Sequence, residues 1–162
     1  MKLANIYLES LVSSNVQIIP YDEDGYDIDY DQWVVADQAE KIANDSGIRI
    51  ARNKNLAYFA RAADDVVGAV WSDVYEDKDQ DAQVYDFDMA IDKSYRNQVG
   101  IFLRLMDAAM KDYRYLKSDF PRSYIRVWVV NPRLVGVLER RYEFELEDEH
   151  GGGTAHMVYH GE

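Results

Sequence analysis

The sequence predicts a single α+β (α/β) domain in which helices and strands follow one another along the chain. A chain of 162 residues with 48% hydrophobic content is long enough to bury one core. Helical and strand-like segments follow the order helix, strand, helix, three strands, helix, strand, helix and two strands. We find no repeat and no linker rich in Pro, Gly or Ser, so we expect one domain over residues 1–162.

The N-terminal part, residues 1–47, is expected to hold two helices and an acidic loop. Its apolar residues recur at helical spacing on either side of a short β-branched run. The loop between them carries six acids and no base. The expected elements are, in order, a helix over 3–11, a strand over 16–19 that Pro20 ends, the loop Tyr21–Asp31, and a helix over 33–46 that Gly47 ends.

The remaining residues, 48–162, are expected to form the core. Two strand-like runs on either side of Asp64-Asp65 predict a β-hairpin. The strand that follows, over 81–91, places Phe87, Met89 and Ile91 on one face and Asp86, Asp88 and Ala90 on the other. The further expected elements are strands over 48–52, 124–130, 143–147 and 154–159, a helix over 100–116, and a helix to Arg141 with Pro132 at its first position.

Charge and composition limit the classes of function. A formal net charge of −12 repels nucleic acids and anionic membranes and attracts cationic partners, although solubility alone is an alternative explanation. Acids gather in Tyr21–Asp31 and again in Asp73–Asp81. There is no cysteine, so we expect no disulfide and no thiolate nucleophile. No apolar run is long enough to span a membrane, and we expect a cytoplasmic protein.

The segment YRNQVGIFLRLMDAAM, Tyr95–Met110, marks a candidate phosphate-binding turn. Gly100 stands where a strand gives way to a helix, and a helix N-terminus exposes unpaired N–H groups and the positive end of the helix dipole. Lys93 and Arg96 flank this turn in an otherwise acidic chain, which favours a bound anion. The alternative is that Gly100 only relaxes the turn between strand and helix.

Three motifs in order resemble the GNAT family of acyl-CoA N-acyltransferases, over roughly Leu56–Glu147. They are Val66-Val67-Gly68 in a hairpin strand, the strand, basic turn and helix of Ile91–Phe102, and Val130-Asn131 followed by a helix and Tyr142-Glu143-Phe144. The resemblance implies a mixed, mostly antiparallel central sheet flanked by helices on both faces. It also implies acetyl-CoA as the cofactor and transfer of acetyl to an amine.

The resemblance also implies which residues bind coenzyme A. Backbone groups of Met89, Ala90 and Ile91 would hold the pantetheine arm. The implied remaining set is Arg96, Asn97, Gln98, Val99, Gly100, Ile101 and Phe102 around the pyrophosphate, together with Asn131. The family's turn usually reads Arg/Gln-x-x-Gly-x-Gly/Ala. Here either Val99 and Ile101 replace the two small residues, or Gly100-Ile101-Phe102 takes the place of Gly-x-Gly with one residue inserted.

Acetyl transfer to an amine needs a base for the attacking ammonium and an acid for the leaving thiolate. Asp86 and Asp88 are the candidate bases, with solvated strand carboxylates as the alternative. The family's tyrosine acid would fall on Leu138, so Tyr142 is the candidate acid, and Tyr124 and Tyr115 are less favoured. The alternative role for Tyr142 is packing under the last strands.

The acidic loop is the candidate acceptor site. Its carboxylates and tyrosines would hold a cationic amine by ion pairs and cation–π contacts, with a solvated loop as the alternative. The candidate substrate-binding residues are Asp22, Asp24, Tyr26, Asp27 and Asp29. A polyamine, an aminoglycoside-like amine or a basic protein segment would fit, and we expect no metal, no nucleic acid and no membrane.

Two hypotheses follow. The first is an N-acetyltransferase that acts on a cationic amine. The second is a catalytically inactive, GNAT-like acidic module that binds a basic protein, for instance as a nucleic-acid mimic. A homodimer remains open under both hypotheses.

Overall fold

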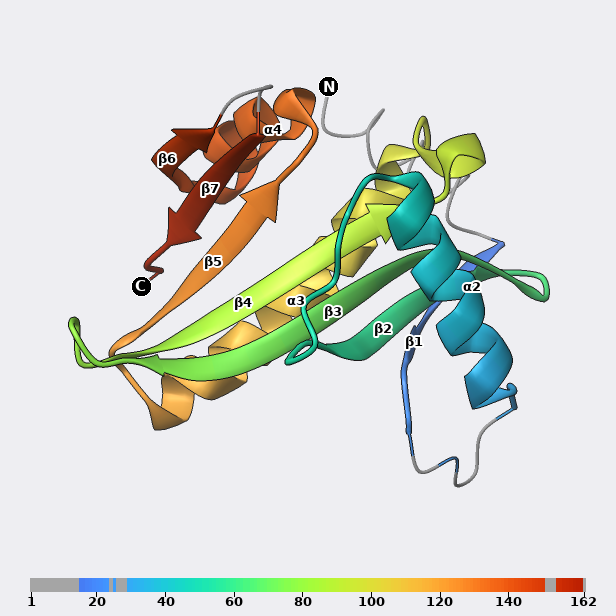
Figure 1. Cartoon of the computed structure of the whole chain (residues 1–162), viewed down its shortest axis with the longest axis horizontal. Helices are drawn as coiled ribbons and strands as arrows, with labels where there is room; N and C mark the ends of the chain where they lie inside the picture. The colour runs from blue at the N-terminus through green and yellow to red at the C-terminus, as the bar shows by residue number, and fades with distance from the viewer. Residues whose placement is uncertain (1–14, 24, 26–28, 151–153, 162) are drawn as a thin grey trace. The chain divides into compact units, whose positions relative to one another are not determined.

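The computed structural model describes residues 15–23, 25, 29–150 and 154–161 (Figure 1). The helix expected over 3–11 and the candidate acceptor residues Asp24, Tyr26 and Asp27 lie outside these residues. The chain divides into two compact units. Unit 1 comprises the described residues up to Trp71 together with Met89–Ala109, and unit 2 comprises Ser72–Asp88 and the described residues from Met110 onwards.

Seven strands form one hydrogen-bonded sheet in the order β1-β2-β3-β4-β5-β7-β6. The β4–β5 pair is parallel, whereas the pairs β1–β2, β5–β7 and β6–β7 are antiparallel, which confirms the mixed sheet that the family resemblance implied. The strands are β1 (Val16–Pro20), β2 (Asn55–Ala62), β3 (Asp65–Asp77), β4 (Ala82–Ile91), β5 (Ser123–Val129), β6 (Glu145–His150) and β7 (Thr154–Tyr159).

The α-helices begin and end at residues of the kinds that commonly cap helices. The side chain of Asp31 accepts hydrogen bonds from the first backbone N–H groups of α2, and that of Asn131 does so for α4, which has Pro132 in its first turn. Gly47, with φ of +73°, follows α2 and provides the left-handed residue that commonly ends a helix. The helices are α2 (Gln32–Asp45), the short 3₁₀ helix η1 (Lys93–Tyr95), α3 (Val99–Asp119) and α4 (Pro132–Tyr142).

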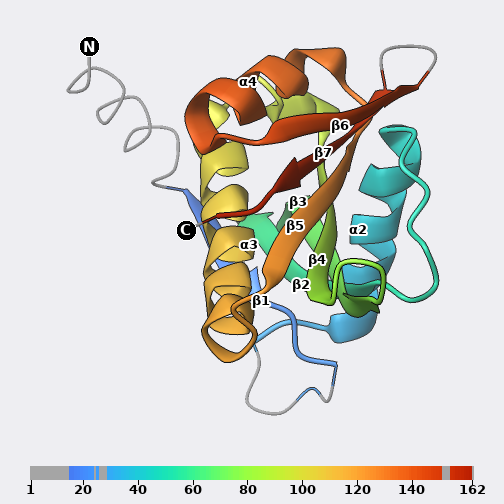
Figure 2. The same cartoon turned by 90° about the vertical axis from the view of Figure 1, so that its left-hand side faces the viewer.

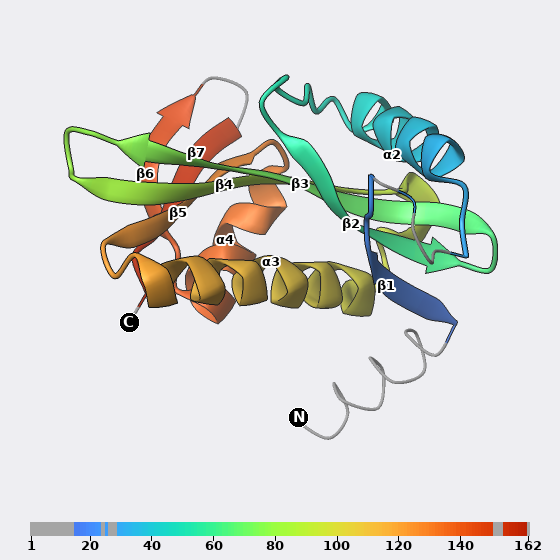
Figure 3. The ribbon, with the colours of Figure 1, turned by 90° about the horizontal axis from the view of Figure 1, so that it is seen from below.

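In unit 1, helices cover both faces of the sheet. Figures 2 and 3 show α2 on one face of β2 and β3, and the Val99–Ala109 part of α3 on the other. Gly68 of β3 lies close under Leu105 of α3. The core on the α2 side consists of Val35, Ala39, Ile42 and Ala43 of α2 with Phe59, Val66, Ala69, Trp71 and Ala90 of the strands.

In unit 2, the residues that alternate along β5 separate two different faces. Ile125, Val127 and Val129 are buried, whereas Arg126 is half-buried and Trp128 is exposed. Residues from α3 lie on the buried face, where the Tyr113 ring meets the Tyr159 ring edge-on at 5.9 Å. We call the face that carries Trp128 the open face of this unit because Trp128 is exposed there, although Tyr124, Val84 and Val158 form a small buried cluster on the same face.

Several expected elements differ from the structure, among them the strand expected over 143–147, which runs from Glu145 to His150. Residues 48–52 form no strand, because the N–H of Ile48 donates to Ala43 at the end of α2 and the N–H of Lys54 donates to Ala51 in a turn. Ile48 and Ile50 instead pack against the core of unit 1. The hairpin turn lies one residue earlier than expected, at 63–64, and Ala63 takes a φ of +53° there.

None of the helices in the described part of the chain combines the length and the hydrophobicity that crossing a bilayer requires.

The contact between Gly68 and α3 gives a prediction about stability. A Cβ atom at Gly68 would lie 3.1 Å from Leu105 and 3.3 Å from the backbone oxygen of Ala90. We expect Gly68→Ala to lower the free energy of unfolding by about 1–3 kcal/mol through overpacking. Urea denaturation measures this change.

The matched control is Gly136→Ala, inside α4. The nearest atoms to its Cβ belong to the mobile guanidinium of Arg140, so we expect a gain of roughly 0.5–1 kcal/mol from helix propensity. Equal effects at the two glycines would contradict the proposed packing of Gly68 under α3.

Candidate functional site

The turn that joins β4 to α3 is fixed by a series of backbone hydrogen bonds. The N–H of Tyr95 donates to the Asp92 carbonyl at 2.8 Å, that of Gln98 to Tyr95 at 3.0 Å, and that of Ile101 to Gln98 at 3.1 Å. The Asp92 carboxylate also accepts from the N–H of Ser94 at 2.8 Å. The turn therefore reaches the start of the helix in one defined conformation.

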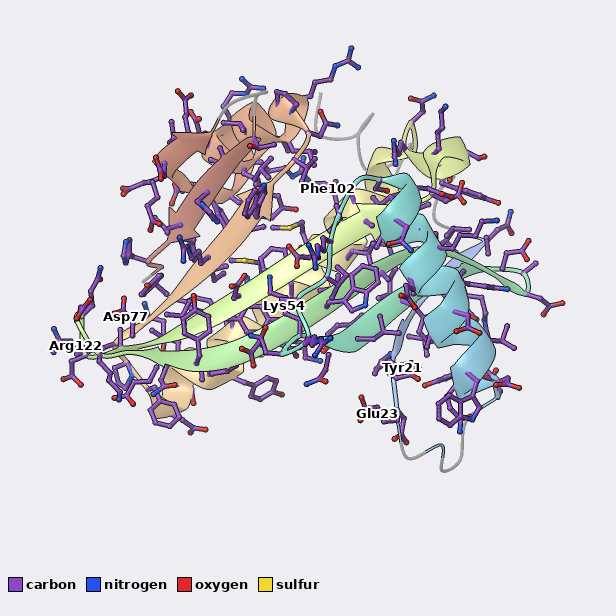
Figure 4. The ribbon with its side chains drawn as sticks, in the orientation of Figure 1. Tyr21, Glu23, Lys54, Asp77, Phe102 and Arg122 are labelled. Atoms are coloured by element: carbon purple, nitrogen blue, oxygen red, sulfur yellow. The ribbon has the colours of Figure 1, made fainter. Side chains whose placement is uncertain are left out.

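The start of α3 is the candidate anion-binding position. The helix runs for 21 residues, so the positive end of its dipole lies at this N-terminus, where the N–H of Ile101 already donates to Gln98. Gly100 is buried, and the Ile101 side chain lies wholly in the core, so its bulk does not occupy solvent in front of the helix. Phe102 is half-buried (Figure 4), and the Val99 side chain lies outside the described part of the chain.

Arg96 joins this turn to the end of α2. Its Nε donates to the carbonyl of Ile91 at 3.0 Å, and its Nη2 donates to Oγ of Ser46 at 2.8 Å. Ser46 in turn donates to the carbonyl of Ile42 at 2.7 Å, in the last turn of α2. A cation is favourable at a helix C-terminus, and the two bonds use two of the five guanidinium N–H donors. The guanidinium is thus held beside the candidate phosphate-binding turn.

The candidate pantetheine-binding residues form the end of β4. The parallel ladder pairs Gln83–Phe87 with Ser123–Val127, so Asp88 lies beyond its last paired residue and β4 continues to Ile91. In unit 1, the Ala90 side chain packs in the core on the α2 side, and Ile91 lies beside Gly68 on the α3 side. The carbonyl of Ile91 is the one that accepts from Arg96.

Asp86 and Asp88 differ in their surroundings. Strand alternation places both on the same side of β4 as Ala90. Asp88 is only 7% exposed, so it is not a solvated strand residue, whereas Asp86 is half-buried and lies opposite Arg126 in the ladder. Both carboxylates interact with other groups of the protein. The buried Asp88 is the better placed of the two for proton transfer away from water.

Arg126 is the fixed cation on the open face of unit 2. It pairs with Glu147 at 3.2 Å. Burial alone would lower the pKa of its guanidinium, but a hydrogen bond with Tyr75 and the charges of Glu147 and Asp86 raise that pKa overall. Arg126 therefore stays charged and offsets part of the negative charge of Asp86.

The candidate acid and Asn131 lie on α4. The Asn131 side chain accepts from the N–H of Arg133 at 3.1 Å, so its amide oxygen is committed to capping the helix. Tyr142 is the last residue of α4 and is half-buried. Leu138, which stands where the family has a tyrosine, is a buried core residue.

The two less favoured tyrosines are poorly placed as acids. The hydroxyl of Tyr124 donates to Asp77 at 2.8 Å. Burial is the largest cause that raises the pKa of Tyr124, and this hydrogen bond adds to it. Tyr115 is exposed on α3.

The described part of the acidic loop is tied to unit 1. Figure 4 shows Tyr21 beyond the end of β1, where its hydroxyl donates to the carbonyl of Gln32 at 3.0 Å. The Tyr30 hydroxyl accepts from the N–H of Asp22 at 2.8 Å, and the Tyr30 ring meets Phe59 edge-on at 4.9 Å. These two tyrosines anchor the loop, so the described part is not a freely solvated segment.

Asp29 has a partner of its own. It is 76% exposed, and its carboxylate pairs with Arg61 at 3.2 Å. The hydrogen bond from Arg61 and then its charge lower the pKa of Asp29. Because Arg61 compensates its charge, Asp29 attracts an external cation less strongly than the sequence suggested.

Sequence reasoning missed Ser46 and Arg61. No local signal marks either one, because they contact Arg96 and Asp29 across separations of 50 and 32 residues. Asp31 was also not assigned as the N-cap of α2, although an Asp before a helical run is a common N-cap. The described residues hold no group of three or more His, Cys, Asp or Glu side chains that could bind a metal.

Comparison with known proteins supports the fold. No family model matches the chain, and neither does any curated protein. Solved structures do match it. An aminoglycoside acetyltransferase from an uncultured soil metagenomic sample, in complex with trehalose, matches with a TM-score of 0.61 and 16% identity, over 86% of this chain and 95% of that chain.

Two further solved structures agree. Arabidopsis thaliana Naa50, in complex with the bisubstrate analogue CoA-Ac-MVNAL, has a TM-score of 0.52 and 14% identity, over 89% of this chain and 97% of that chain. An acetyltransferase of the GNAT family from Staphylococcus aureus Mu50 has a TM-score of 0.55 and 15% identity, over 88% and 97%. The chain therefore has the GNAT fold, as its motifs predicted.

The Arg61–Asp29 pair gives a prediction about pH. Because the pKa of Asp29 is lowered in the folded state, the stability that the pair contributes is full above the unfolded pKa of about 3.9 and is lost as the pH falls through the folded value. We expect Arg61→Met to raise the Asp29 pKa toward its ordinary value, as measured by NMR titration of the carboxyl carbon. Arg122→Met, which breaks the separate pair with Asp81, is the control and should leave that titration unchanged.

Proposed function

We propose that this protein is an N-acetyltransferase that moves acetyl from acetyl-CoA to the primary amine of a cationic small molecule or of a basic protein. The observation that carries this proposal is the β4–α3 turn. Backbone hydrogen bonds set its conformation, Gly100 lies in the first turn of the long helix α3, and the guanidinium of Arg96 is held beside it. A solved structure with the same fold, Naa50, is in complex with a CoA-containing bisubstrate analogue.

The residues of unit 1 fit coenzyme A. The first turn of α3 from Gly100 would accept the pyrophosphate, with Arg96 supplying charge-assisted hydrogen bonds from its remaining donors. The backbone of Met89–Ile91 would bind the pantetheine arm in the manner of a strand. The bound coenzyme supplies a thioester, whose carbonyl carbon is open to attack by an amine.

The chain's own residues would then manage protons. Asp88, with Asp86 as the second choice, would take the proton of the acceptor ammonium, which frees the nitrogen lone pair to form the new C–N bond. When the C–S bond breaks, Tyr142 would give its hydroxyl proton to the departing sulfur. Water exclusion around a buried Asp88 would strengthen these interactions.

The acceptor would be held by negative charge. The net charge of −12 attracts a cation at long range, and the acidic loop supplies carboxylates near the N-terminal strand. Asp22, Asp24, Tyr26 and Asp27 would make the contacts, with a smaller part for Asp29 because of Arg61. Polyamines, aminoglycoside-like amines and lysine-rich segments have the matching chemistry.

Two observations favour the second candidate function, a catalytically inactive acidic module that binds a basic protein. The family's tyrosine position is the buried Leu138, and the oxygen of Asn131 is used by the helix cap. An inactive module would bind its partner whether or not acetyl-CoA is present.

Binding of acetyl-CoA distinguishes the two functions. We expect calorimetric titration of the protein to show saturable binding, and Arg96→Ala to weaken it by roughly 10–100-fold through loss of charge-assisted hydrogen bonds. Ser46→Ala, which removes one partner of Arg96 but keeps the guanidinium, should change the dissociation constant by no more than about twofold.

Equal losses in the two variants would mean that Arg96 acts only by joining α2 to the turn. If millimolar acetyl-CoA does not bind to the unmodified protein, the enzyme proposal is wrong.

Proton transfer gives a further prediction. We expect Asp88→Asn to lower kcat by roughly 10²–10⁴-fold in a thiol-release assay with a polyamine acceptor, because the amide cannot accept the ammonium proton. Acetyl-CoA binding should be unchanged. Asp86→Asn is the matched variant, and a larger loss there than at Asp88 would reverse the assignment of the base.

A further inference from the structure

We propose that the outer edge of β6 is a docking surface for an extended, lysine- or arginine-rich segment of a partner protein, which adds to the sheet as a further strand. This surface belongs to unit 2, whereas the candidate coenzyme-binding turn belongs to unit 1. The proposal concerns binding alone and does not depend on acetyl transfer.

The first step is the position of β6. It is the last strand in the sheet order, it pairs with β7 along one side, and no described strand pairs with the other (Figure 1). Backbone N–H and C=O groups along such an edge are a template for another strand. Six residues, Glu145–His150, provide a length typical of a paired strand.

The second step is charge. The segment EFELEDE, Glu143–Glu149, carries five acids and no base, and all five are exposed. Glu147 is engaged with Arg126 at 3.2 Å, and the acids that lie within β6 are Glu145, Glu147, Asp148 and Glu149, whereas Glu143 precedes the strand. Like charges on neighbouring strand positions repel, and basic side chains on an added strand relieve that repulsion.

The third step is the register, which gives the added strand a pattern. Residues that pair across β5, β7 and β6 lie on the same face. On the open face, Trp128 pairs with His156 and His156 with Asp148, and Arg126 is connected in the same way to Glu145. On the opposite face, the rows end at Leu146 and Glu149. A partner strand therefore meets carboxylates at Glu145 and Asp148 and then the His150 position on the open face, and one apolar and one acidic position on the other.

The fourth step separates docking from simple protection of an edge. Charges on edge strands commonly prevent aggregation, and one or two suffice for that. Here four of the six residues of β6 are exposed acids, which is more than edge protection needs, and Leu146 stays 44% exposed among them. At the opposite edge of the sheet, β1 (VQIIP) carries no acid at all.

The test uses the full-length protein and a fluorescein-labelled peptide, Lys-Val-Lys-Val-Lys-Val-Lys, in fluorescence anisotropy. We expect saturable binding. The dissociation constant should rise roughly ten-fold between 50 and 200 mM salt, because salt screens the charges along the β6 edge. A peptide of the same sequence with alternate backbone nitrogens methylated keeps its charge but cannot pair as a strand. It should bind at least about ten-fold more weakly, since main-chain hydrogen bonds provide affinity in strand addition.

Two double variants locate the surface. Glu145→Lys with Glu149→Lys reverses the charge of the edge and should weaken the peptide by at least about ten-fold. The control, Asp37→Lys with Glu40→Lys, makes the same change in net charge on the exposed side of α2 and should stay within about two-fold. Circular dichroism of each variant checks the fold.

Equal binding of the methylated peptide, or equal losses in the two double variants, would overturn the proposal in favour of general charge attraction. Acetyl-CoA binding, measured on the same variants, should not change. A loss there would bear on the proposed enzyme and not on the docking surface.

Discussion

The passage from β4 into α3 is the constraint on which unit 1 depends. The chain has to leave β4, turn and begin α3 within a few residues, without displacing the sheet or α2. Backbone hydrogen bonds set the turn, and the N–H of Asp92 ties its beginning to the carbonyl of Val67 in β3. Arg96 then links the end of β4 to the last turn of α2 through Ser46. The Arg96 side chain thus contacts the end of β4 and the end of α2, and it places a cation beside the start of α3.

The negative charge of the protein is organised in three different ways. In the loop, Asp29 is compensated by Arg61, and tyrosine hydroxyls hold the backbone near it. In β4, Asp88 is buried, which suits proton transfer and not solubility. Along β6, exposed acids line an open edge. The net charge of −12 is therefore a sum over acids in different surroundings: one paired loop carboxylate, a buried carboxylate on β4 and exposed acids on β6.

The same residues can serve the fold and the chemistry. Asn131, which the motif assigned to the cofactor, is engaged as a helix cap, and Arg96 is engaged by the end of α2. A guanidinium retains further donors after such contacts, whereas the single oxygen of an amide is largely used by a cap. Arg96 is therefore the more useful of the two for binding an anion.

The sequence by itself determined the elements and their boundaries wherever the signal is local. The caps Asp31 and Asn131, the helical spacing of α3 and the β-branched run of β5 each lie within a few residues, so each could be predicted, as could the order of motifs that pointed to the GNAT fold. Residues 48–52 misled because alternating isoleucines pack on a core without joining the sheet. The sequence indicated where along the chain the candidate site residues lie, but it did not indicate which side chains contact them.

Only the tertiary structure decided which charges are compensated, buried or exposed. Ser46 meets Arg96, and Arg61 meets Asp29, because the sheet order brings together segments that are far apart in sequence. Asp86 and Asp88 have the same spacing and chemistry, yet only Asp88 is fully buried. The physical reason is range: capping and periodicity act over one or two turns of chain, whereas burial and ion pairing depend on whichever strand or helix folding places alongside.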